Sequence, residues 1–342
     1  MGATLKDIAQ EAGVSVSTVS RILNTGHADK FRPSTVERIR AIAAKHGYQP
    51  NFQARQLRMQ SQEALPPVQT KVAELGYALK VPNTQASMPI HLPIINGVEE
   101  EATRLGYRVS FRQYLTNLEG EYYVDEVCAY LEQGNGLIII GTPEGKERTI
   151  LAQYRKNLVV AYGDLWQEEV DSIEEDDVTG NRELVDYLVA KGHQRIALIG
   201  GFENDHRWRS LLAALGEHGI TPPDQYIRQC EYLYDRAYQA AKEMVELPTP
   251  PTAVCASSDI MAAAAIKALK DAGVRVPEDM AVTGFGDISI ARSMDPPLTT
   301  VRMELTLMGQ IAVRLLQERL LNLRDKPVYV KTPAKLVVRS SA

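Results

Sequence analysis

Apolar residues in the first 47 positions recur every three or four residues, in three short runs. Thr4 is placed to cap a helix at the first run, and Gly13 ends that run. Ser15 can cap the second run, while Pro33 opens the third and Gly47 closes it. This spacing predicts three short helices, the first two joined by a tight turn. Their predicted apolar faces are Leu5, Ile8, Ala9 and Ala12, then Val16 or Val19 with Ile22 and Leu23, then Val36, Ile39, Ile42 and Ala43.

The pattern changes after residues 60–70, which contain Pro66 and Pro67, lack periodicity and are interpreted as a linker. From there on, short apolar runs alternate with stretches of helical period, which predicts βαβ units, parallel sheets and two lobes with a cleft between them. Residues 72–82 fit this pattern poorly and are expected to make a weak strand. The predicted strands are 137–140, 158–162, 196–199, 253–256 and 281–285, and the predicted helices are 97–105, 180–191, 207–218, 237–247 and 260–272.

Charge is distributed unevenly along the 342 residues, whose formal net charge is -5. Residues 1–60 hold nine Lys or Arg against four Asp or Glu, a net of +5, so the remaining chain carries -10. A basic head suits the phosphate backbone of DNA, and an acidic body repels it. The second predicted helix is short and polar on one side, which suits the major groove. A small helical bundle that binds protein is the alternative, but the basic excess in the same segment favours DNA.

Several classes of protein are disfavoured. The N-terminus lacks the apolar stretch of a secretory signal and no run is long enough for a membrane span, so we expect a soluble, cytoplasmic protein. Cys128, Cys230 and Cys255 are scattered and odd in number, which predicts reduced thiols. The stretch GTPEGKE at 141–147 lacks the spacing and the hydroxyl of a phosphate loop. With no nucleophile elbow either, we expect no enzyme activity, no cofactor and no metal.

Five stretches carry a specific resemblance to one family of regulators. TLKDIAQEAGVSVSTVSRILN at 4–24 and HGYQPN at 46–51 match its head in order and spacing. In the body, KGHQRIALIG at 191–200, the segment 256–288 and PPLTTVRM at 296–303 match as well. On these residues the chain resembles the lactose-repressor/galactose-repressor (LacI/GalR) family. The resemblance implies an all-α helix-turn-helix domain followed by an α/β body of two parallel-sheet lobes, similar to periplasmic sugar-binding proteins.

The resemblance also implies how the head holds DNA. Residues 51–58 are similar to the family's hinge helix, which is implied to order only on DNA, as the instability of an isolated eight-residue helix would require. Two such helices from a homodimer would enter the minor groove, with Leu57 as a wedge between base pairs. By pattern alone, Val16 and Leu57 are equally compatible with an apolar core. The residues implied to contact DNA are Val16, Ser17 and Arg21 at bases, Ser15, Thr18 and Ser20 at phosphates, and also Thr4, Asn24, Asn51, Ala54, Arg55 and Leu57.

Polar residues just after the predicted strands are candidates for ligand binding, because parallel sheets bind ligands at the carboxyl ends of their strands. Strand position alone selects Asp164, Ser257, Ser258, Asp259 and Asp287. The resemblance implies that Arg207 makes bidentate bonds to an effector and that Tyr232 packs on its ring, although a surface ion pair and a half-buried aromatic are the alternatives. Tyr77, His91 and Asn117 lie near predicted strand ends in the first lobe. The predicted effector-binding set is Tyr77, His91, Asp164, Arg207, Tyr232, Ser258 and Asp287.

One position departs from the family: Gly286 stands where an acidic residue is usual, which leaves the identity of the effector open. The resemblance implies a homodimeric repressor of a carbohydrate-utilisation operon, released from operator DNA by a saccharide such as a galactose-type sugar. A purine-type corepressor, a stand-alone sugar-binding module and a carbohydrate enzyme are the alternatives. The chain ends without a trailing heptad helix, which argues against a tetramer.

Domain boundaries follow from the same patterns. The predicted domains are 1–47 for the helix-turn-helix, 48–70 for the hinge helix and linker, and 71–342 for effector binding and dimerisation, with lobe 1 at about 71–160 and 292–322 and lobe 2 at about 161–291 and 323–342.

Overall fold

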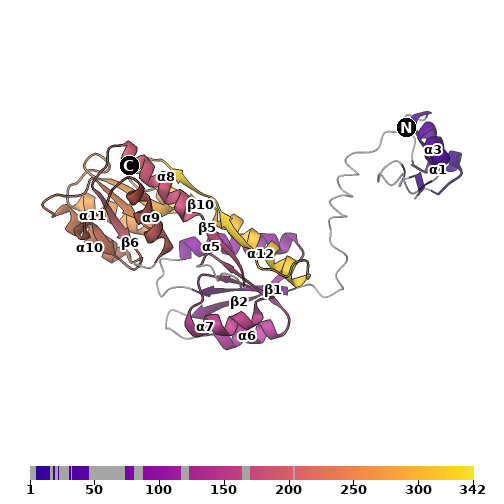
Figure 1. Cartoon of the computed structure of the whole chain (residues 1–342), viewed down its shortest axis with the longest axis horizontal. Helices are drawn as coiled ribbons and strands as arrows, with labels where there is room; N and C mark the ends of the chain where they lie inside the picture. The colour runs from indigo at the N-terminus through magenta and orange to yellow at the C-terminus, as the bar shows by residue number, and fades with distance from the viewer. Residues whose placement is uncertain are drawn as a thin grey trace. The chain divides into compact units, whose positions relative to one another are not determined.

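The chain forms two compact units, residues 1–71 and residues 72–342 (Figure 1). No helix in the described part of the chain combines the length and the apolar character that crossing a bilayer requires. The computed structural model describes residues 5–15, 18–19, 22, 31, 33–45, 74–80, 88–116, 123–163, 170–202 and 205–342.

The first unit is helical around a small apolar core. Helix α1 spans Leu5–Ala12 and α3 spans Pro33–Lys45, and Thr18, Val19 and Ile22 between them are also helical. The Lys45 Nζ atom lies 2.7 Å from the Glu11 carboxylate and ties α3 to α1. The buried side chains, each predicted to face inward, are Ile8, Ala9, Ala12, Val19, Ile22, Val36, Ile39 and Ala43.

The second unit contains two six-stranded sheets, each with its own helices, which we call the first and second lobes. In the first lobe the strand order is β11-β5-β4-β3-β1-β2, and all the paired strands run parallel. Helices α5 and α12 pack together on one face of this sheet, while α6 and α7 lie on the other (Figure 1). The elements of the first lobe are β1 Glu74–Lys80, α5 Met88–Arg104, β2 Arg108–Thr116, α6 Val124–Glu132, β3 Gly136–Ile140, α7 Gly145–Leu151, η3 Ala152–Tyr154, β4 Leu158–Ala161, β5 Asp171–Glu175, α12 Leu305–Leu320 and β11 Tyr329–Thr332.

The second lobe repeats this plan with one antiparallel edge. Its strand order is β12-β10-β9-β8-β6-β7, with β12 antiparallel to β10 and the other pairs parallel. Helix α8 packs against α9, and α10 packs against α11. The elements are α8 Asp177–Ala190, β6 Ile196–Gly200, α9 His206–Glu217, η4 Asp224–Tyr226, β7 Ile227–Gln229, α10 Tyr234–Val245, β8 Ala253–Ala256, α11 Asp259–Asp271, β9 Ala281–Gly286, η5 Ser289–Arg292, β10 Thr299–Met303 and β12 Ala334–Val337.

The five predicted apolar runs are strands β3, β4, β6, β8 and β9, and the predicted fold class is confirmed. The expectation of a weak strand at residues 72–82 is wrong. Strand β1 lies between β2 and β3, and its five central residues are buried although they include Gly76 and Tyr77. Gly76 has a packing role, because a Cβ atom there would lie 2.7 Å from the Cβ atom of Phe111 on β2. The glycine therefore allows the close approach of β2, and the residues on either side of it are buried.

The chain passes between the lobes three times, after β5, between β10 and α12, and between β11 and β12. These crossings lie later in the chain than the predicted boundaries at residues 160, 291 and 322. Strand β5 explains the first difference: its sequence Asp-Ser-Ile-Glu-Glu has no apolar run, yet it pairs with β4 and β11 inside the first sheet. Ion pairs and hydrogen bonds, which an apolar pattern does not reveal, satisfy its polar residues.

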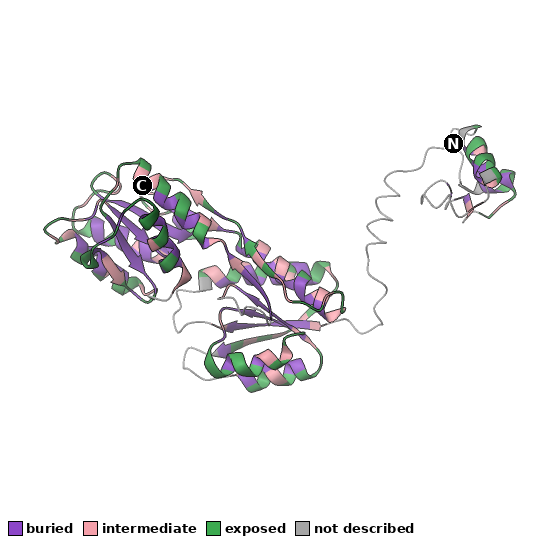
Figure 2. Ribbon diagram, in the orientation of Figure 1, coloured by how far each residue is buried: buried purple, intermediate pink, exposed green. Residues whose placement is uncertain are grey.

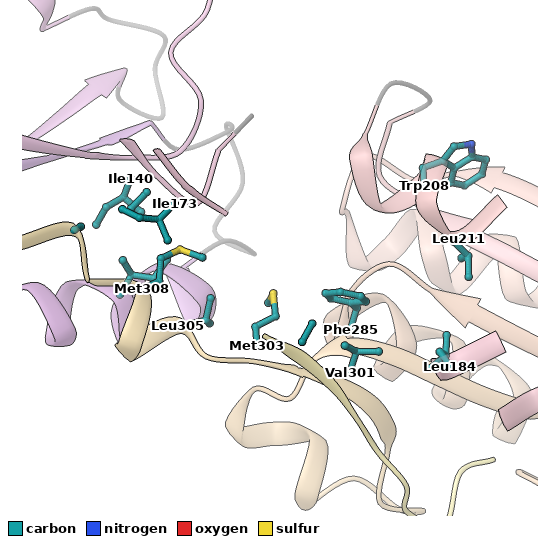
Figure 3. Packing of buried hydrophobic residues seen from close by; sticks show 14 of the residues in the cluster. Ile140, Ile173, Leu184, Trp208, Leu211, Phe285, Val301, Met303, Leu305 and Met308 are labelled. Atoms are coloured by element: carbon teal, nitrogen blue, oxygen red, sulfur yellow. The ribbon is translucent and has the colours of Figure 1, made fainter. Parts of the chain in front are cut away.

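Burial is concentrated in the sheets and on the inner faces of the helices (Figure 2). The largest apolar cluster extends through both lobes: Ile140 and Ile173 come from the first sheet, Phe285 from the second, and Met303 and Leu305 flank the second crossing (Figure 3). The two lobes therefore share a continuous core at the crossings.

Candidate ligand-binding cavity and DNA-binding head

A cavity of about 570 Å³ is lined by both lobes at the carboxyl ends of their parallel strands. This is the edge at which open α/β sheets bind ligands. The first lobe contributes Lys80, Ile90, His91, Gly141, Thr142, Glu144, Tyr162, Gly163 and Glu175, and the second contributes Phe202, Asp205, His206, Arg207, Glu231, Tyr232, Ser258, Asp259, Ile260, Phe285 and Ile288.

Arg207, in the first turn of α9, is buried in this cavity and bonded to the first lobe. Its Nε and Nη2 atoms donate to Glu175 Oε1 at 3.1 and 2.6 Å, and Nη2 also donates to the Tyr162 hydroxyl at 2.7 Å. The guanidinium lies over the Phe285 ring, 4.6 Å from its centre. Burial opposes the charge, but Tyr162 and Glu175 outweigh it and hold the pKa of Arg207 well above its ordinary value. The side chain is a fixed cation.

Glu175 ends strand β5 immediately before the first crossing between the lobes, and only 2% of it is exposed. Both of its bonds from Arg207 reach Oε1, and the His206 Nε2 atom is 4.0 Å from the same oxygen. No described residue donates a hydrogen bond to Oε2. Because Glu175 lines the cavity, its Oε2 atom can accept a hydrogen bond from a ligand there.

His91, on α5, is also 2% exposed, and its Nδ1 atom has no partner among the described residues. Its ring meets the Tyr162 ring edge-on, with 5.8 Å between the ring centres. Burial lowers the pKa of His91 to about 4, so the imidazole is neutral near pH 7. A neutral imidazole offers one donor and one acceptor.

Two tyrosines in the cavity wall have left-handed backbones. Tyr162 has φ 56° and Tyr232 has φ 58°, a conformation that costs a non-glycine residue about 1–3 kcal/mol and clusters at binding sites. Burial raises the pKa of Tyr162 to about 12. The Tyr232 hydroxyl donates to Asp205, and its ring lies 6.2 Å from that of Phe202. Together with Phe285, these rings give the cavity apolar faces beside its charged groups.

The second-lobe wall carries carboxylates at the starts of two helices. Asp205 caps α9 by accepting from the Arg207 backbone N–H at 2.9 Å. Ser258 caps α11, where its Oγ atom accepts from the Met261 N–H at 3.3 Å. Asp259, the first residue of α11, accepts from the Ile288 N–H at 2.8 Å and from Thr300 Oγ1.

Two further groups titrate at unusual pH values. Burial raises the pKa of Asp259 to about 6, despite the hydrogen bonds that it accepts. His206 Nδ1 lies 3.3 Å from the Asp177 carboxylate. Burial opposes the imidazolium, but the hydrogen bond to Asp177 and the charge of Glu175 outweigh it and raise the pKa of His206.

Four of the predicted effector-binding residues, His91, Arg207, Tyr232 and Ser258, line the cavity. Tyr77 and Asp287 do not. Tyr77 is buried on β1 under the guanidinium of Arg112. Asp287 follows its strand with φ 50° and accepts from Arg302 Nε at 2.7 Å and from Arg339, so it serves as an ion-pair centre. Asp164 and Asn117 lie outside the described residues.

The prediction from the sequence did not include the lining residues Lys80, Tyr162, Glu175, Asp205 and His206. The signal for Tyr162 was present, because it ends a predicted strand. Asp205 and His206 directly precede a predicted helix, where a capping acid is common. Glu175 gave no such signal, because its strand was not recognised.

In the first unit, Ser15 accepts a hydrogen bond from the Thr18 N–H at 3.1 Å, and the two hydroxyl oxygens lie 2.9 Å apart. Ser15 thus accepts from the N–H of helical Thr18, as the cap that the spacing predicts would do. The other residues implied to contact DNA lie outside the described residues: Thr4, Val16, Ser17, Ser20, Arg21, Asn24, Asn51, Ala54, Arg55 and Leu57.

A helical N-terminal unit, followed by two parallel-sheet lobes around a polar and aromatic cavity, defines a ligand-binding regulator with a separate head. Residues 4–51 match the bacterial regulatory proteins of the lacI family, and residues 185–342 match the periplasmic binding protein-like domain. The chain therefore combines a lacI-family DNA-binding head with a periplasmic binding protein-like body.

Curated and solved relatives extend over nearly the whole chain. The HTH-type transcriptional repressor CytR of Escherichia coli strain K12 is 29% identical over 324 residues, covering 93% of this chain and 90% of CytR. The transcriptional regulator CelR in complex with cellobiose has a TM-score of 0.71 at 26% identity, covering 99% of this chain and 100% of CelR. The Lac repressor dimer bound to operator and the anti-inducer ONPF has a TM-score of 0.68 at 26% identity, covering 100% and 99%.

Proposed function

We propose that this protein is a transcriptional repressor that binds operator DNA through residues 1–71 and is released when a saccharide occupies the cavity. The match of residues 4–51 to the lacI family supports the DNA-binding role, as does the net charge of +5 on residues 1–60. The cavity supports the sensing role. The two roles belong to different units, so a ligand acts on DNA binding from a distance.

The observation that carries the proposal is the buried Arg207–Glu175 pair surrounded by aromatic rings. A planar guanidinium and a carboxylate suit the adjacent hydroxyls of a sugar, and the rings of Tyr232 and Phe202 suit its apolar face. His91 Nδ1 has no partner among the described residues, and both bonds from Arg207 to Glu175 reach Oε1, so His91 Nδ1 and Glu175 Oε2 supply further hydrogen-bonding capacity. A cavity of about 570 Å³ has room for a mono- or disaccharide.

The relatives support the same ligand class. CelR is a solved complex with cellobiose, and the Lac repressor is a solved dimer on operator DNA. By this likeness we propose a homodimer whose two heads occupy successive major grooves, about 34 Å apart on a pseudo-palindromic operator. In this proposal Val16, Ser17 and Arg21 read bases, and Leu57 enters the minor groove. The coupling between cavity and head is about 1–3 kcal/mol, as in other allosteric proteins.

A gel-shift assay on DNA upstream of the gene, repeated with a panel of mono- and disaccharides, tests the proposal. An active saccharide lowers operator affinity about 5- to 150-fold. Arg207→Lys keeps a cation beside Glu175 but loses the planar fork, so we expect DNA binding to persist and the saccharide response to weaken at least tenfold. Arg275→Lys, at a side chain 69% exposed and absent from the cavity lining, is the matched control.

The outcomes are distinct. A wild-type response from Arg207→Lys would remove Arg207 from the ligand site. A compound that tightens rather than loosens the gel shift would make the protein a corepressor-dependent regulator. No sequence-selective shift on any duplex at low salt would contradict the repressor itself.

A further inference from the structure

The charges around the cavity are strongly unbalanced. Of the side chains that line it among the described residues, five are carboxylates and only two are permanent cations, Lys80 and Arg207. Each cation already has a carboxylate of its own: Arg207 Nη2 is 2.6 Å from Glu175, and Lys80 Nζ is 2.9 Å from Glu147. The cavity therefore presents an excess of negative charge with no unpaired permanent cation to offset it.

On the second-lobe wall, the helix starts, which usually attract anions, are already occupied by the protein's own acids. The N-terminus of α9 is capped by Asp205. The N-terminus of α11 carries Asp259, whose two oxygens accept from Ile288 and Thr300. An incoming phosphate or carboxylate would have to displace these groups to reach the helix dipoles.

The stretches of the second unit that lie outside the described residues supply no positive charge to the cavity. These stretches are 72–73, 81–87, 117–122, 164–169 and 203–204, and none of them contains Lys, Arg or His. Six of their residues are acidic: Glu119, Glu121, Asp164, Glu168, Glu169 and Glu203. Wherever these stretches lie, they add no cation.

We propose, resting on the proposed function above, that the effector is a saccharide without acidic groups, either a neutral glycoside or an amino sugar. An acidic sugar at Arg207 would meet a guanidinium whose Nε and Nη2 atoms already donate to Glu175, so the charge of the cation is already balanced by a carboxylate 2% exposed. The open Oε2 atom of Glu175 accepts from a hydroxyl or an amine but repels a second anion. Sugar phosphates and uronates are thus excluded by charge rather than by size.

Calorimetric titration of the full-length protein with sugars matched in their ring tests this inference. One set is galactose, galactosamine, galacturonate and galactose 6-phosphate, and the second set is the four corresponding glucose compounds. Cellobiose and lactose are included as neutral disaccharides. In whichever set binds, we expect the neutral and amino members to bind at least tenfold more tightly than the acidic members. Tighter binding of an acidic member than of its neutral parent would overturn the inference.

Two variants separate charge from shape. Glu144→Gln and Glu231→Gln each remove one carboxylate from the cavity lining, and Glu278→Gln removes an exposed one elsewhere. Each lining variant should improve the affinity of acidic relative to neutral sugars about two- to fivefold, as expected for one unit charge near a partly hydrated site. Using both variants covers the case in which Glu144, which caps α7, is needed for folding. Affinity ratios identical to the control in both would overturn the electrostatic basis.

The results also distinguish this inference from the proposed function. Binding of a neutral sugar with no change in the gel shift would support the charge selection and contradict the regulatory role. Preference for an acidic sugar that releases DNA would do the reverse. Failure of every sugar to bind would overturn both.

Discussion

The two walls of the cavity bury their polar groups in different ways. On the second-lobe wall, Asp205 and Ser258 accept from the first turns of α9 and α11, and Asp259 accepts from Ile288 and Thr300 of the same lobe. On the first-lobe wall, His91 Nδ1 has no partner among the described residues, and the bonds from Arg207 to Glu175 reach Oε1 rather than Oε2. The second wall is therefore set before any ligand arrives, whereas the first keeps hydrogen-bonding capacity that a ligand can use. Arg207 joins the two.

The largest expected effect follows from breaking the Arg207–Glu175 ion pair that joins the two walls. Arg207→Ala leaves Glu175 buried without its cation and should lower the free energy of unfolding by about 3–5 kcal/mol. The double variant Arg207→Met with Glu175→Gln removes both charges and should recover most of this loss. Urea denaturation measures all three proteins. Arg275→Ala, at an exposed ion pair, should change stability by less than about 1 kcal/mol. Equal losses of unfolding free energy in the single and double variants would mean that the unpaired buried charge of Glu175 is not the cause of the destabilisation.

The first-lobe wall can be tested through the pH response of His91. Its pKa is lowered from 6.5 to about 4 by burial, so the unfolded chain binds the proton first as the pH falls. The stability of the wild type should thus decrease between pH 6.5 and 4, with about 3 kcal/mol attributable to this group. His91→Gln cannot titrate and should lack that component. The difference between the two urea-denaturation curves over this range isolates it, and parallel curves would contradict the assignment.

The second-lobe wall can be tested through Ser258, which caps α11. Ser258→Ala removes the side-chain oxygen that accepts from Met261 N–H and should cost about 1 kcal/mol. Thermal unfolding gives the difference. Ser293→Ala, where an exposed hydroxyl only donates to the Ile290 carbonyl, should stay within about 0.5 kcal/mol of wild type. A loss no greater than that of the control would show that the wall does not depend on its cap.

The same contrast between the walls decided what could be predicted from sequence. The second wall follows apolar strands such as β6, β8 and β9, so its strand ends pointed to Ser258, and the family resemblance added Arg207 and Tyr232. The first wall depends on β1 and β5. Gly76 in β1 and the Asp-Ser-Ile-Glu-Glu sequence of β5 do not have the pattern of a buried strand. Glu175 was missed because ion pairs across distant segments bury it. Asp287 was misjudged because a strand end fixes a residue's place but not the direction of its side chain.

The smallest effect is a pH response opposite in sign to that of His91. Contact with Asp177 raises the pKa of His206 above its ordinary 6.5, outweighing burial. The resulting stabilisation is fully present below about pH 6.5 and is lost as the pH rises through the raised value. The side chain is 35% exposed, so we expect less than about 1 kcal/mol. His206→Gln should flatten this decline between pH 6 and 8 while leaving the acid-side loss due to His91 intact. If His206→Gln instead removed the acid-side loss, the two histidines would titrate as one coupled group, and the contrast between a preset wall and an open wall would not hold.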